Sequence, residues 1–400
     1  ELKEFLANVR QHLKGAIEAN LREDGLYHAY NILHLDPKKK IASIEYLGPM
    51  LEGQVAVLSS KAIAASEAVS LLQALRNSSL YCEQRKSYIL YADKRLPAFL
   101  DYNKVESTVA KDIPLLATMI EQGDNRILET SPDGYYRFNA SIRNRFELKE
   151  TLEQLSEDAS LKVAVAQDEQ ALYDLYETTF NHKAFTGRSG SMFAYEGLGS
   201  IYWHMVSKLM LAVQEIALEN SEDAAFPRLV EFYYNVQEGL GFRKKASDYG
   251  AFTADAYSHT PSFAGAQQPG LTGMVKEGVI CRFNELGVQF DQGAIVFRPQ
   301  LLKRSELLEH SVSTDCILPN NQVHTVEVPS GSLLFTITQV PVVYKLTDAN
   351  TPSIEIVCAD GPTERLEGDV LNQEISESLL SRQSKILSVT VHQPSARFID

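Results

Sequence analysis

The hydrophobic pattern changes character near residue 290, and this change limits what the chain can fold into. Before it, apolar residues recur at helical spacing over residues 2–17, 62–76, 107–122, 168–179, 201–218 and 226–238. After it, β-branched stretches bounded by turn residues follow, as in GAIVFRPQLL, HTVEVPSGSLLFTITQVPVVYKL, SIEIVCADG and KILSVTVHQ. The sequence therefore predicts a mainly α protein with a β-domain: a helical domain over residues 1–290 and a C-terminal β-sandwich or jelly-roll over residues 291–400.

Charge and composition exclude several classes of protein. The net charge is −14 with both signs interspersed, which argues against a nucleic-acid partner. No apolar stretch approaches the length of a membrane span, and the first residues form a charged amphipathic pattern without a secretory signal. Cys82, Cys281, Cys316 and Cys358 are far apart and contain no CxxC pair, so we expect free thiols, no metal site and a cytoplasmic protein.

The first segment with chemical character is 185–208, FTGRSGSMFAYEGLGSIYWHMVSK, a glycine-rich stretch that leads into a helix. Its glycines allow a ligand to approach the backbone closely, and Arg188, Glu196 and His204 add groups that carry charge. The alternative is a loop that packs its own aromatic residues, with His204 a hydrogen-bonded core histidine.

The second segment is 249–277, YGAFTADAYSHTPSFAGAQQPGLTGMVKE, a long stretch of small and polar residues before another helix. Thr272 and Gly273 fall near the predicted helix start, where a hydroxyl, free N–H groups and the positive end of the helix dipole can hold phosphate. Alternatively, Thr272 is only the N-cap of the helix.

Together the two segments resemble the cellobiose and chitobiose phosphorylase family, through GSIYWH ending at His204 and PGLTG containing Thr272 and Gly273. The resemblance implies an (α/α)6 toroid followed by a β-domain, with inorganic phosphate bound by the histidine, the threonine hydroxyl and the glycine N–H. We call His204, Thr272 and Gly273 the helix-start cluster. The family's glutamate before its glycine pair is displaced by one residue, at Glu196, and its Asp-Trp-Asn-Asp motif is absent.

The family's general acid lies well upstream of its phosphate histidine, which by the same spacing implies residues 24–54. Asp24, followed by Gly-Leu and aromatic residues, is the preferred candidate for the catalytic acid, and Asp36, Glu45 and Glu52 are the other carboxylates there. The alternative is that Asp24 merely caps a turn with Gly25.

The family's phosphate-binding arginine has no counterpart at the expected position, and this leaves two possibilities. Either Arg188 replaces it, or the chain is the C-terminal part of a longer enzyme whose N-terminal section supplies it. We prefer the second, because we count about eight to ten helices where a full toroid needs twelve.

The predicted activity is phosphorolysis, or reverse synthesis, of a β-linked gluco-oligosaccharide with inversion, giving a sugar 1-phosphate. Inorganic phosphate is the co-substrate, and no other cofactor is expected. The alternatives are an inverting glycoside hydrolase on the same toroid and a non-catalytic carbohydrate-binding part of a larger enzyme; a homodimer is possible. The candidate sugar-binding residues share polar or aromatic side chains within the two segments: Tyr195, Glu196, Tyr202, His259, Gln267 and Gln268.

Overall fold

The computed structural model describes residues 2–83, 86–92, 103–180, 203–240 and 272–400. The chain divides into two compact units, each described here by itself. The first comprises residues 1–91, 201–257 and 266–400, and the second comprises residues 92–200 and 258–265. Within the first unit, a succession of strands begins at Val288.

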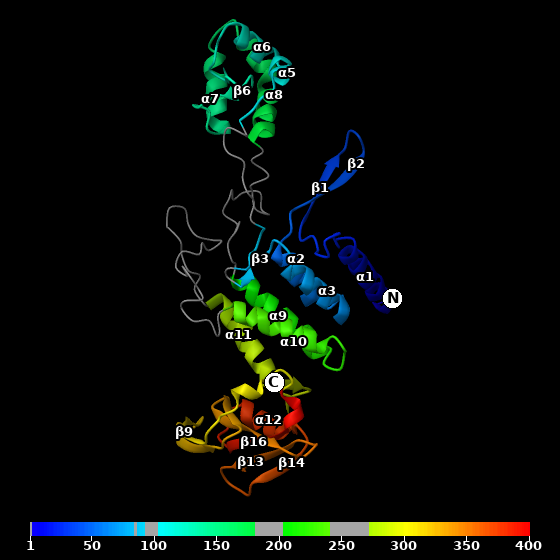
Figure 1. The fold of residues 1–400 in the computed structure, drawn as a ribbon, viewed down its shortest axis with the longest axis vertical. Helices are drawn as coiled ribbons and strands as arrows, with labels where there is room; N and C mark the ends of the chain where they lie inside the picture. The colour runs from blue at the N-terminus through cyan, green and yellow to red at the C-terminus, as the bar shows by residue number, and fades with distance from the viewer. Residues whose placement is uncertain (1, 84–85, 93–102, 181–202, 241–271) are drawn as a thin grey trace. The chain divides into compact units, whose positions relative to one another are not determined.

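The first unit contains a layer of helices around a central one, α9 (Trp203–Glu219), which contacts four of the described helices. These are α2 (Leu51–Ser60), α3 (Ala65–Arg76), α10 (Phe226–Gly239) and α11 (Thr272–Glu285), and α3 also packs against α2 and α10 (Figure 1). Helix α9 takes the central place because its buried residues form two adjacent stripes. Met205, Leu209 and Ile216 lie on one stripe, and Val206, Met210 and Val213 lie on the other.

Helices were expected along residues 1–300, and most of the predicted ones are present, including α1 (Leu2–Glu18). The first unit also contains two short antiparallel hairpins in this stretch. Strands β1 (Asn31–Asp36) and β2 (Ile41–Tyr46) form one, and β3 (Tyr81–Cys82) and β4 (Ser87–Tyr88) form the other.

The C-terminal part of the first unit is built on a five-stranded mixed sheet of order β11-β12-β16-β13-β14. Strands β12 and β16 are parallel, and the other pairs are antiparallel. The buried side chains of this sheet include Val342, Tyr344, Ile354 and Val389. The strands are β11 (Ser332–Ile337), β12 (Val340–Thr347), β13 (Ser353–Cys358), β14 (Glu364–Glu367) and β16 (Ile386–Pro394).

Smaller elements complete this part. Strands β7 (Val288–Asp291), β8 (Ala294–Phe297) and β15 (Val370–Leu371) form a three-stranded sheet, and β9 (Val312–Ile317) pairs with β10 (Val323–Val328). Helix α12 (Gln373–Leu380) contacts β8. Two short 3-10 helices follow strands β8 and β16 in the sequence: η4 (Arg304–Glu306) and η5 (Ser395–Arg397).

The strands predicted after residue 290 are therefore present, but the architecture expected for the whole chain is not. The described residues form a mixed α/β structure with several small sheets, and they form no closed toroid. Periodicity assigns a segment to a helix or a strand, whereas the closure of a ring depends on how many hairpins pack together, which no local pattern encodes.

The second unit has its own apolar core, formed by Leu116, Met119, Phe138, Leu152 and Leu172 among others. Asn144 caps the helix that begins at Arg145 by accepting hydrogen bonds from the N–H groups of Phe146 and Glu147. The elements are α5 (Ser107–Lys111), α6 (Pro114–Glu121), β5 (Leu128–Thr130), β6 (Tyr136–Phe138), α7 (Arg145–Leu155) and α8 (Lys162–Phe180).

Among the described residues, no helix combines the length and apolarity needed to cross a bilayer. The four cysteines are free; Cys281 and Cys316 are buried, and Cys82 and Cys358 are half-buried. Within the same described ranges, no group of His, Cys, Asp and Glu side chains is arranged to hold a metal ion.

Candidate functional site: the starts of helices α2, α9 and α11

Helices α9 and α11 run in the same direction. The amide of Gln214 on α9 donates to the carbonyl of Cys281 on α11 at 2.9 Å and accepts a hydrogen bond from Asn284 Nδ2, also at 2.9 Å, so the two helices lie side by side. Figure 1 shows both helices beginning at the same end of the layer.

Helix α2 begins at this end too. At its far end, Lys61 forms an ion pair with Glu219, the last residue of α9. At its near end, the N–H of Leu51 donates to Leu90 O at 3.0 Å, just after the β3–β4 hairpin. Gly239, the last residue of α10, lies against Lys86 of the same hairpin. A Cβ on Gly239 would come within 2.4 Å of Lys86 O, so only glycine allows this contact.

The helix-start cluster occupies the first turns of α9 and α11. His204 is the second residue of α9 and half-buried, and its carbonyl accepts a hydrogen bond from Ser207 Oγ at 2.9 Å. Thr272 and Gly273 are the first two residues of α11, as the sequence predicted for this helix start. The first N–H groups of a helix lack intrahelical acceptors and carry the positive end of its dipole, so two such ends together favour an anion.

The other predicted residues of the two glycine-rich segments lie outside the described residues. They are Arg188, Tyr195, Glu196, Tyr202, His259, Gln267 and Gln268.

Asp24, the predicted general acid, lies in a loop held against the first turns of α2. The side chain of Gln54 on α2 bonds the backbone of Tyr27 on both sides, accepting from its N–H at 2.9 Å and donating to its carbonyl at 2.8 Å. Gly53 leaves room for this approach, because a Cβ there would meet Ala29 Cβ at 3.0 Å.

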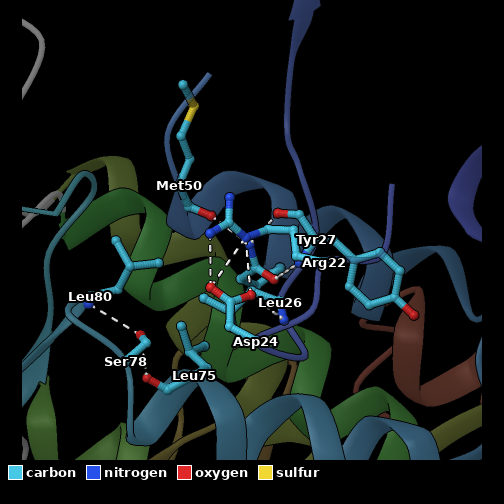
Figure 2. Close-up of polar contacts among 9 residues, drawn as sticks. Arg22, Asp24, Leu26, Tyr27, Met50, Leu75, Ser78 and Leu80 are labelled. Carbon is cyan, nitrogen blue, oxygen red and sulfur yellow. Dashed lines mark hydrogen bonds and ion pairs between the residues drawn. The ribbon is translucent and has the colours of Figure 1, made fainter. Parts of the chain in front are cut away.

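The carboxylate of Asp24 is engaged by an arginine two residues before it (Figure 2). Arg22 donates from Nε to Oδ1 at 3.0 Å and from Nη2 to Oδ2 at 2.8 Å, and the N–H of Leu26 donates to Oδ1 at 3.2 Å. The hydrogen bonds from Arg22 lower the pKa of Asp24. A general acid needs a raised pKa, so this environment opposes the role predicted for Asp24 and fits the turn-capping alternative.

Glu52 differs from the other carboxylates of residues 24–54 in its position. It lies in the first turn of α2, half-buried, and accepts a hydrogen bond from Tyr30 Oη at 2.6 Å. Asp36, in contrast, closes the β1–β2 turn by accepting from the N–H groups of Lys38 and Lys39, both at 3.0 Å. Glu45 contacts His34 at 2.7 Å across the exposed hairpin.

A cavity of about 510 Å³ lies beside Asp24. Its lining includes Arg22 and Glu23 as well as His28 and Tyr46, whose rings stack with centroids 4.1 Å apart. Aromatic rings together with a few charged groups are a common lining of small-molecule sites.

A buried polar network fixes α10 and α11 to each other, and sequence reasoning missed it. Glu285 accepts hydrogen bonds from Tyr233 Oη at 2.6 Å, from the Gln237 amide and from Arg282 Nη1 at 2.6 Å; Arg282 also pairs with Glu306 at 2.8 Å. The available signal was the spacing of Glu277, Cys281 and Glu285 at i, i+4 and i+8, which places them on one helix face. Burial of that face raises the pKa of Cys281 to about 12.

Comparison with known proteins adds one relationship. No curated protein matches the chain. A family model described as GH149 phosphorylase insertion domain 2 matches residues 96–183, which lie within the second unit. Through this segment the chain is similar to the GH149 glycoside phosphorylases, and not specifically to the cellobiose phosphorylases.

Proposed function

We propose that this chain belongs to a glycoside phosphorylase and carries its phosphate-binding residues at the helix-start cluster. The reaction is phosphorolysis of a β-linked gluco-oligosaccharide with inversion, releasing a sugar 1-phosphate. The match of residues 96–183 to a GH149 phosphorylase insertion domain supports the reaction class.

The observation that carries the proposal is the common direction of the neighbouring helices α9 and α11, which brings the first turns of both to one end of the layer (Figure 1). His204 and the Thr272–Gly273 pair come from segments far apart in the sequence, yet they begin neighbouring helices. An inverting hydrolase needs a carboxylate to activate water, whereas phosphate is already an anionic nucleophile and needs only to be held in position. Two helix starts with a histidine and a threonine hydroxyl provide such a holder.

The leaving oxygen must still be protonated by a carboxylic acid on the opposite face of the sugar. Among the carboxylates of residues 24–54, we favour Glu52 over Asp24, because Glu52 lies in the first turn of α2, at the end of the layer where α9 and α11 begin. Asp24 is held charged by Arg22.

The test measures release of sugar 1-phosphate from β-linked gluco-oligosaccharides with and without inorganic phosphate. Thr272→Ala and His204→Ala each remove one group expected to contact a charged ligand, so the KM for phosphate should rise about 10-fold to 100-fold, with a small change in the KM for saccharide. Thr118→Ala is the matched control, since it removes a hydroxyl that donates to Pro114 O at 2.9 Å within α6 of the second unit.

Three outcomes would contradict the proposal. Hydrolysis that needs no phosphate would indicate an inverting glycoside hydrolase. Saccharide binding without turnover would indicate a non-catalytic carbohydrate-binding part. Equal loss of phosphate and saccharide affinity in Thr272→Ala would remove the specific role of this residue.

A further inference from the structure

Helix α11 has an unusual buried face. Glu277, Cys281 and Glu285 follow one another at intervals of four residues, and all three are buried. The face packs against α9 and α10, since Gln214 bonds the carbonyl of Cys281 and Tyr233 bonds Glu285. Two carboxylates in such a place require hydrogen-bond donors.

The two carboxylates differ in how far this requirement is met. Glu285 has donors from Tyr233, Gln237 and Arg282. The side chain of Glu277 is only 4% exposed, and no donor among the described residues bonds its buried Oε2. Lys276 Nζ lies 3.6 Å from the other oxygen, Oε1, and its side chain is largely exposed.

The direction of the Glu277 side chain follows from helix geometry. Side chains on a helix lean toward its N-terminus and cover the residue four positions earlier. For Glu277 that residue is Gly273, which has no side chain to occupy the space. The carboxylate is therefore directed toward the start of α11, at the end of the layer where α9 also begins.

We propose that Glu277 is a saccharide-binding residue, whose Oε2 accepts a hydrogen bond from a hydroxyl of the sugar unit next to the helix-start cluster. This inference rests on the proposed function, because it assigns a further residue to the same site. A carboxylate oxygen accepts hydrogen bonds, so its partner must donate; a sugar hydroxyl does so, whereas a phosphate dianion would repel it. Glu285 cannot take this role, since its oxygens are already occupied.

The experiment compares Glu277→Gln with the wild-type chain in binding and in stability. Glutamine keeps the shape of the side chain but replaces one acceptor oxygen with a donor. We expect about tenfold or greater loss of affinity for a bound disaccharide, tested with sophorose, laminaribiose, cellobiose and gentiobiose by titration calorimetry. Affinity for inorganic phosphate should not fall, because the substitution removes a negative charge near the anion. The melting temperature should not fall either, because no hydrogen bond to Oε2 is lost.

Glu285→Gln is the matched control, on the same buried face of the same helix. It removes the charge that Arg282 and Tyr233 contact, so its melting temperature should fall while disaccharide affinity is retained. If Glu277→Gln instead lowers the melting temperature without a selective loss of disaccharide affinity, Glu277 is structural and the inference is overturned. The same conclusion follows if the wild-type chain binds phosphate but none of the four disaccharides. A wild-type chain that binds neither ligand overturns the proposed function itself.

Discussion

Replacing Asp24 by asparagine separates the two roles that sequence and structure assign to this residue. Asparagine keeps an Oδ1 that can accept the N–H of Leu26, now at 3.2 Å, but loses the charge that Arg22 contacts at 3.0 and 2.8 Å. The turn therefore survives the substitution, and only the ion pair and any acid function are removed.

The magnitudes of the two effects differ enough to distinguish the roles. The side chain of Asp24 is 49% exposed, and an ion pair at such exposure contributes about 0–1 kcal/mol to stability. Loss of a general acid lowers the rate about 10²-fold to 10⁴-fold. Since Arg22 holds the carboxylate charged, we expect the rate of sugar 1-phosphate release to stay within about fivefold of the wild type, which is about 1 kcal/mol of barrier.

The pH dependence of stability has a defined sign. The pKa of Asp24 is lowered in the folded chain by its bonds from Arg22. Its contribution is therefore complete above the ordinary carboxyl pKa of 3.8 and is lost as pH falls through the lowered value. The difference in melting temperature between wild type and Asp24→Asn should be constant at neutral pH and shrink below about pH 4.

Asp124→Asn is a matched control for these measurements. Asp124 makes the same forked contact with an arginine two residues away, Arg126, in the second unit, and its pKa is lowered for the same reason. Both variants should lose similar small amounts of stability and retain activity. A 100-fold or greater loss of rate in Asp24→Asn alone, with the melting curve intact, would refute the reasoning from the ion pair and assign the acid to Asp24.

Two further substitutions test the packing around the site. Tyr233→Phe removes a fully buried hydroxyl that donates to Glu285 at 2.6 Å, so it should cost about 1.5–3 kcal/mol and raise amide exchange rates in α10 and α11; unchanged exchange would contradict the importance of this bond. Gly287→Ala places a Cβ 2.0 Å from the Arg298 carbonyl carbon at a φ of +69°, whereas Gly123→Ala has the same φ with no atom within 4 Å. Both substitutions should lower the free energy of unfolding by the backbone strain, about 1–2 kcal/mol. Only Gly287→Ala should lose additional stability from the steric clash, so equal losses would show that the neighbouring backbone moves freely.

For the candidate site, sequence reasoning located a helix start but not its surroundings. The long stretch of small and polar residues before another helix placed Thr272 and Gly273 near a helix start, and α11 begins at Thr272. Sequence reasoning could not predict that Arg22 bonds the carboxylate of Asp24. This contact between side chains two residues apart depends on the turn that Gly25 makes at a φ of +78°. Glu277 was missed because glutamate on a helix is usually solvated, and only packing reveals that it is buried.

The sequence by itself determined the local elements, because helical and strand periodicities are properties of a few neighbouring residues. It placed helices α9 and α10 within a few residues of their observed bounds. It also located the change from helices to strands, which begins with β7 and β8. Only the tertiary structure decided that α2, α9 and α11 begin at one end, that residues 92–200 form a separate unit, and that the C-terminal strands form a mixed sheet. These features depend on contacts between distant segments, such as Lys61 with Glu219 and Gln214 with Cys281, and no local pattern specifies which segments meet.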